Sequence, residues 1–170
     1  MKLYPLKLTP QSSERLWGGS RLQAFVPGFD KVQTKEPLGE AWLVYAENKI
    51  ANGALAGQTL QQVASTYGVE LLGTKSMARY GTKVPLLAKF LDPAQWLSIQ
   101  VHPDDTYALS KEASTGYLGK TEAWYVLAAK EDSQIIWGFK QEVTQEQVRE
   151  AIANGTLENL LKQNGFKDIA

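Results

Sequence analysis

The chain has 170 residues, and its 18 Lys and Arg balance 18 Asp and Glu, so the net charge at pH 7 is zero. A neutral chain without a run of basic residues creates no general field for a polyanion, which argues against nucleic-acid binding. The lack of cysteine excludes disulfides and thiolate metal ligands and favours a cytoplasmic location. No segment reaches the roughly 18 apolar residues of a membrane helix, so no membrane partner is expected.

The first half of the chain predicts short strands separated by turns. Residues 38–46 alternate between two sets of side chains, which is the period of a strand. Thr59 and Gln62 stand at the spacing of a capping box and predict a short helix that ends at Gly68. Strand character returns over residues 83–92.

Three further strands and two helices complete the predicted order. The strands are expected at residues 95–103, 121–129 and 133–139. Past Phe139 the pattern changes, and Thr144 and Thr156 each stand where a helix N-cap is expected. We therefore expect a mainly β domain over residues 1–139, followed by a helical segment over residues 140–170.

The single histidine of the chain lies in "LSIQVHPDD". Alternation places Ser98, Gln100 and His102 on one face of the expected strand. On spacing alone, a face that looks at water and a histidine that is structural are the favoured interpretation. The alternative is a metal site that adds Glu122 from "GKTEAWYVL" to Gln100 and His102, a donor set that suits Zn²⁺ better than Fe²⁺ or Mn²⁺.

Five segments, in one order, resemble a known enzyme family. They are "RLWGG", "EPLGEAWLV", "PLLAKFLD", "LSIQVHPDD" and "GKTEAWYVL". This series resembles the type I mannose-6-phosphate isomerases, which are zinc-dependent phosphomannose isomerases of the cupin superfamily, and in particular their short bacterial branch. The resemblance implies a cupin-type β-barrel, or jelly roll, that holds one zinc. It places Gln100, His102 and Glu122 among the zinc ligands, with Gln100 ranked below the other two.

The same resemblance implies a sugar-phosphate substrate and an interconversion of mannose 6-phosphate and fructose 6-phosphate. Lys120 matches a family lysine near the substrate, which makes it the catalytic candidate and the first candidate for holding the phosphate. Lys89 lies where the family has another polar pocket residue. Trp17, Glu40 and Trp42 match pocket-wall positions, and Trp17 and Glu40 are candidate substrate contacts, although packing in the core is the favoured interpretation for these three.

The family pattern continues beyond what this chain holds. A second histidine ligand and a catalytic arginine are expected after the helical segment, in a second cupin half that is absent here. We therefore expect the N-terminal portion of such an isomerase, truncated and poorly active. The alternatives are a non-catalytic single-cupin module for sugar-phosphate binding or interaction, and a second half supplied by a separate chain. Unpaired barrel edges predict self-association.

Overall fold

The computed structural model describes residues 2–135, 138–139, 141–164 and 167–168. Within it the chain forms two compact units, Met1–Gln100 and Val101–Ala170. The expected division after residue 139 into a β domain and a helical segment stays a prediction. None of the helices in the described part of the chain has the length and apolar character that a membrane span requires.

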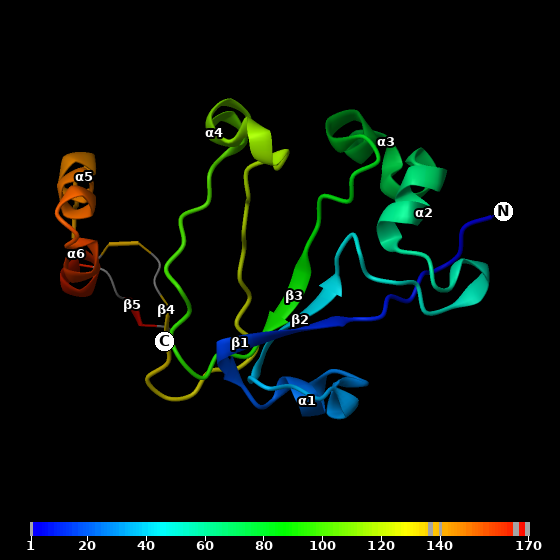
Figure 1. Ribbon diagram of the computed structural model, residues 1–170, viewed down its shortest axis with the longest axis horizontal. Coiled ribbons are helices and arrows are strands. Elements are labelled where there is room, and N and C mark those ends of the chain that lie inside the picture. The colour runs from blue at the N-terminus through cyan, green and yellow to red at the C-terminus, as the bar shows by residue number, and fades with distance from the viewer. Residues whose placement is uncertain (1, 136–137, 140, 165–166, 169–170) are drawn as a thin grey trace. The chain divides into compact units, whose positions relative to one another are not determined.

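The first unit is built on a three-stranded antiparallel sheet, in which β1 (Gln11–Gly19), β2 (Leu38–Val44) and β3 (Ala88–Leu91) lie side by side in that order (Figure 1). The strand predicted at 38–46 is thereby confirmed. Helix α1 (Leu22–Phe25) and the 3₁₀ turn η1 (Phe29–Lys31) contribute to a buried apolar cluster with β2. Its members are Leu22, Val26, Phe29, Leu38 and Ala41.

Two helices and a short turn form the other part of the first unit: η2 (Gly53–Leu55), α2 (Leu60–Tyr67) and α3 (Val69–Tyr80). The predicted capping box of α2 is confirmed, because the Thr59 hydroxyl accepts from the Gln62 backbone N–H and the Gln62 side chain accepts from the Thr59 backbone N–H. Helix α3 is not predicted from the sequence. Gly73 inside it has a φ of 78°, which interrupts the helical backbone and weakens the pattern.

The second unit contains helices and one small strand pair. Its elements are α4 (Asp105–Lys111), η3 (Ala113–Thr115), β4 (Gln134–Ile135), α5 (Gln145–Ala153), α6 (Leu157–Asn164) and β5 (Lys167–Asp168). Strands β4 and β5 pair antiparallel. The predicted cap of the first C-terminal helix is confirmed, since Thr144 and Gln147 form a capping box at α5. The strand expected at 133–139 is described only in part, because residues 136–137 lie outside the described residues.

Two predicted strands are wrong in this structure. Residues 95–103 and 121–129 contain no strand. A strand requires a neighbouring backbone to pair with, and side chains that alternate correctly do not supply one. Val101 is 93% exposed and Tyr125 is 87% exposed, so these segments lack the cover of a buried sheet. The mainly β expectation therefore holds only in part, as a small antiparallel sheet accompanied by several helices.

Candidate metal and sugar-phosphate site

A close backbone approach brings the predicted metal ligands of the second unit together. The Lys120 backbone N–H donates to the Pro103 carbonyl, with 3.0 Å between nitrogen and oxygen. The adjacent Gly119 N–H donates to Asp105 Oδ1 at 3.1 Å. A Cβ on Gly119 would lie 2.3 Å from the backbone carbon of Asp104, so only glycine permits this approach. The two hydrogen bonds fix the extended segment around Lys120 beside the segment that holds His102.

Three side chains meet where these segments lie beside each other. Glu122 Oε2 lies 2.9 Å from His102 Nε2 and 2.8 Å from Lys120 Nζ. Lys120 Nζ also lies 3.2 Å from His102 Nε2. The structure therefore brings together three of the residues that the sequence predicts for the site. The side chains of His102 and Glu122 are only about a quarter exposed, at 28% and 25%.

The carboxylate of Glu122 is held ionised by its neighbours. The pKa of Glu122 is lowered from the ordinary value of 4.5 to about 2, and a hydrogen bond from Lys120 is the largest of the influences that together produce this shift. Burial acts in the opposite direction, while the positive charge of Lys120 adds to the lowering. The Trp124 indole N–H donates to Glu122 Oε1 at 2.8 Å and lowers the pKa further. One oxygen is thus anchored by the indole, and the other faces the histidine.

The donor atoms at this cluster are of the types that bind a divalent metal. An imidazole nitrogen and a carboxylate oxygen are both ordinary zinc ligands, and two ligands of a tetrahedral zinc lie about 3.3 Å apart. The observed 2.9 Å between His102 Nε2 and Glu122 Oε2 is the distance of a direct contact and is shorter than that separation, so a shared ion would require the two side chains to move slightly apart. The indole on the second oxygen of Glu122 is the kind of outer contact that orients a metal ligand. In the part of the chain that the structure describes, however, no three His, Asp or Glu side chains gather to hold a metal.

A second charged cluster lies on the sheet of the first unit, around Glu40. This side chain is only 7% exposed, and both of its oxygens have partners. Oε1 pairs with Lys89 Nζ at 3.2 Å, while Oε2 pairs with an Arg15 guanidinium nitrogen at 3.2 Å and accepts from the Trp42 indole at 2.7 Å. Burial raises the pKa of Glu40, but the Trp42 hydrogen bond and the two cations outweigh it, so the net shift is downward. The carboxylate is therefore ionised and committed to holding two cations.

The remaining predicted residues have clear positions. Trp17 is half-buried on β1 and packs over Gly39, where an added Cβ would lie 2.8 Å from the indole, which agrees with a packing role. Gln100 is exposed in the first unit, and its amide nitrogen donates to Ser98 Oγ at 2.8 Å. The roles of Gln100 as a ligand and of Trp17, Glu40 and Lys89 as substrate contacts stay predictions.

Two residues that contact the candidate site glutamates are not predicted from the sequence, Arg15 and Trp124. Arg15 is not among the predicted site residues, and its signal is its place at the start of "RLWGG", within β1 and beside the register shifts in the pairing of β1 with β2. Trp124 shares the alternating face of Lys120 and Glu122, and this spacing could have identified it as the partner of the carboxylate.

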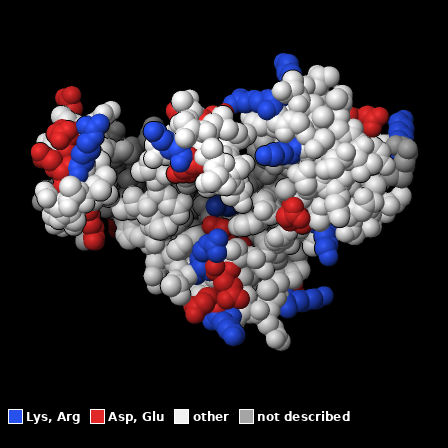
Figure 2. Space-filling view, turned by 45° about the horizontal axis from the view of Figure 1, so that its top comes forward, with Lys and Arg blue, Asp and Glu red and all other residues white. Residues whose placement is uncertain are grey.

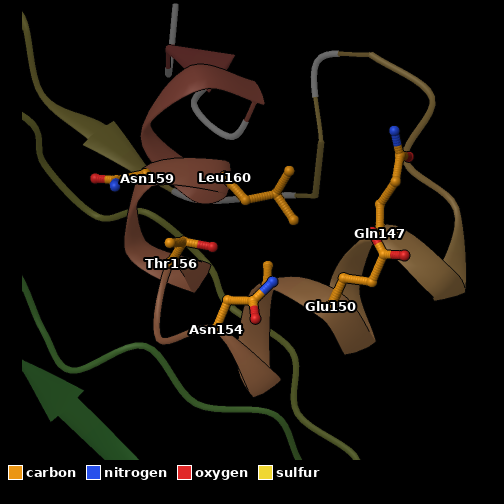
Figure 3. A pocket seen from close by; sticks show the side chains of 7 residues that line it. Gln147, Glu150, Asn154, Thr156, Asn159 and Leu160 are labelled. Carbon is orange, nitrogen blue, oxygen red and sulfur yellow. The ribbon is translucent and has the colours of Figure 1, made fainter.

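The visible face in Figure 2 and one hollow of the second unit are alternatives to the His102 cluster. Figure 2 shows basic and acidic groups interspersed over the visible face, without a broad area of one sign. A hollow of about 360 Å³ lies between α5 and α6, where Leu160 extends toward the side of Gln147 and Glu150 (Figure 3). Its lining is made of amide, hydroxyl, carboxylate and aliphatic side chains, without an imidazole, a lysine or an aromatic ring. We therefore take the His102 cluster, and not this hollow, as the candidate site.

The low pKa of Glu122 makes a pH prediction for stability. Because the pKa is lower in the folded chain than the ordinary value of 4.5, its contacts stabilise the fold fully above pH 4.5 and lose that effect as the pH falls toward 2. We expect wild type to exceed Glu122→Gln in free energy of unfolding at pH 7, with the difference shrinking below pH 4.5. Urea denaturation across this range measures it. A difference independent of pH would contradict the ionic role.

Comparison with known proteins places the chain in a family. Residues 5–142 match the family described as phosphomannose isomerase type I, catalytic domain, which is generally metal-dependent. A "Probable mannose-6-phosphate isomerase" of Bacillus subtilis is 39% identical over 168 residues, which are 96% of this chain and 50% of that protein. A mannose-6-phosphate isomerase of Streptococcus mutans is 38% identical over 161 residues, 92% of this chain and 47% of that protein.

A solved structure gives the same result at the level of the fold. The crystal structure of the mannose 6-phosphate isomerase from Bacillus subtilis superposes with a TM-score of 0.75 at 34% sequence identity, and the match covers 97% of this chain and 49% of that one. The chain spans about half the length of the relatives it matches. Because the family match covers most of its residues, the chain belongs to the type I phosphomannose isomerase family.

Proposed function

We propose that this chain supplies part of the active site of a zinc-dependent mannose-6-phosphate isomerase, which interconverts mannose 6-phosphate and fructose 6-phosphate. The observation that supports this most is the contact of His102 Nε2, Glu122 Oε2 and Lys120 Nζ, all within 3.2 Å of one another. Membership of the family and the names of the relatives support the reaction. The cytoplasmic location expected from the sequence is part of the same proposal.

The proposed roles follow from the chemistry of the isomerisation. Moving the carbonyl from C1 to C2 transfers a proton between these carbons through a cis-enediol and shifts protons between the two oxygens. His102 Nε2 and Glu122 Oε2 would hold the metal, and Trp124 would fix the orientation of Glu122. A bound zinc would supply positive charge at the sugar oxygens. Lys120 would give or take a proton at Nζ, or hold the phosphate.

The Glu40 cluster of the first unit provides a second proposed contact with the sugar phosphate. Two cations share one carboxylate, so the cluster has a net charge of +1. Lys89 Nζ uses one donor on Glu40 and is 21% exposed in its side chain, which leaves donors for an anion. We propose that Lys89 binds substrate, and that β1, β2 and β3 form part of the wall of a cupin-type barrel.

A non-catalytic interaction module is the second candidate function. Its support is the extended segment 124–127, where Trp124, Tyr125, Val126 and Leu127 are all exposed. Contiguous exposed apolar side chains with an unpaired backbone favour association with another chain, including a second copy of this one. This candidate requires sugar-phosphate binding or self-association without turnover.

Zinc binding tests the metal assignment directly. We expect the purified chain to bind about one Zn²⁺ in isothermal titration calorimetry, and His102→Ala and Glu122→Gln to weaken the affinity at least 10-fold, as loss of a ligand does. Glu131→Gln removes an exposed carboxylate of the same unit and should leave the affinity unchanged. Wild-type affinity in both ligand variants would refute the assignment.

Turnover separates the two candidate functions. Two protein ligands are fewer than the three or four that zinc sites in proteins use, so the chain alone should isomerise mannose 6-phosphate at a small fraction of the rate of a full-length relative. A coupled assay for fructose 6-phosphate, with zinc added and His102→Ala as the control, measures the residual rate. Zinc-dependent turnover that His102→Ala abolishes supports the isomerase. Sugar-phosphate binding without any turnover supports the module.

A further inference from the structure

The ammonium group of Lys120 contacts both of the proposed metal ligands. Its ammonium nitrogen lies 2.8 Å from Glu122 Oε2 and 3.2 Å from His102 Nε2. These are the same two atoms that the proposed metal would bind. A positive group supplied by the chain itself therefore contacts both atoms that would hold the proposed cation.

The hydrogen-bonding capacity of these atoms prevents Lys120 and a metal from being held in the same way at once. A lysine ammonium can only donate, and a neutral imidazole has one ring nitrogen with a free lone pair. If Nε2 accepts from Lys120, the lone pair that a metal requires is already used. If Nε2 instead carries the proton and donates to Glu122, a metal displaces that proton, and Oε2, which has two lone pairs, can still accept from Lys120. Metal binding therefore replaces a hydrogen bond of Lys120 in the first tautomer, and in the second only the positive charge of Lys120 opposes the metal.

The charge of Lys120 acts in the same direction. A divalent cation on Oε2 and an ammonium on the same oxygen would place like charges within a few ångströms of each other, with part of the cluster screened from water. The Lys120 side chain is 42% exposed, so it has room to turn away from the cluster. The Lys120 ammonium can therefore turn away without a steric obstacle, and remaining beside a bound metal would be electrostatically unfavourable.

We propose that Lys120 is an internal competitor for the metal, so that metal binding displaces its ammonium from Glu122 and His102 and frees it for other contacts. The inference rests on the proposed metal site. It gives Lys120 a positioning role that depends on the metal, because Nζ becomes available to an anionic substrate only when the cation has taken its place.

Metal affinity in a lysine variant tests the inference. In titrations of the full chain with Zn²⁺, Lys120→Met should bind about fivefold more tightly than wild type, because one competing ion pair is removed. Lys130→Met removes an exposed lysine of the same unit and should leave the affinity unchanged. Damage to the fold would lower the affinity, so a gain identifies competition. Unchanged or weaker binding by Lys120→Met, with a circular dichroism spectrum like that of wild type, would overturn the inference.

Chemical labelling gives a readout that is independent of affinity. Acetylation of lysines by an active ester, followed by peptide mass spectrometry, should show Lys120 reacting faster after Zn²⁺ is added, with Lys130 unchanged. Equal or slower labelling of Lys120 with zinc bound would contradict displacement. If neither wild type nor Lys120→Met binds Zn²⁺, the proposed metal site fails together with the inference. If both bind equally, only the inference fails.

Discussion

The close approach of Gly119 to the start of α4 is the constraint on which the candidate site depends. Without a side chain at this position, the Lys120 backbone can donate to Pro103, and the next residues run beside the histidine. Extended backbone then directs Lys120, Glu122 and Trp124 to one side, because side chains alternate along it. One carboxylate receives the indole on one oxygen and meets the imidazole and the ammonium with the other.

The two units share one local arrangement, a glutamate that is hydrogen-bonded by a nearby tryptophan, but its surroundings differ between them. In each, a glutamate receives an indole N–H from the tryptophan two residues later, in Glu40 with Trp42 and in Glu122 with Trp124. Each glutamate also meets at least one cation, and the pKa of each is lowered. The settings differ in the other partners. Glu40 is buried and its oxygens are taken up by two cations, whereas Glu122 faces a histidine, which adds an imidazole nitrogen to its cluster.

Local sequence signals predict some of the helix ends correctly, whereas the strands depend on pairing between distant segments, which the sequence does not reveal. The capping boxes at Thr59 and Thr144 are visible in the sequence because donor and acceptor lie three residues apart. Residues 95–103 and 121–129 have the composition of strands, but a strand also needs a partner backbone, which the pattern of one segment cannot supply. Helix α4 also has a local signal, because the Asp104 side chain accepts from the Tyr107 N–H. This N-cap is not predicted, since Asp104 is interpreted as part of the segment that contains His102.

The residues of the candidate site can be predicted from the sequence in part, as the fold can. Alternation and the family resemblance together indicate His102 and Glu122, and the structure places them in contact. The location of Lys120 between them is not predictable, because the spacing of two residues fixes a shared face but not the direction in which a long flexible side chain turns. Arg15 reaches Glu40 from a neighbouring strand, across a bulge whose position the sequence does not reveal.

The most direct test of the account is the state of the imidazole itself. His102 is the only histidine in the chain, so its two ring nitrogens can be assigned without ambiguity in a long-range ¹H–¹⁵N correlation spectrum. The account predicts that adding one equivalent of Zn²⁺ moves the Nε2 resonance to the range of a metal-bound nitrogen, with a smaller change at Nδ1. A spectrum in which zinc leaves both resonances in place, or binds Nδ1 instead, would contradict a metal site shared by His102 and Glu122.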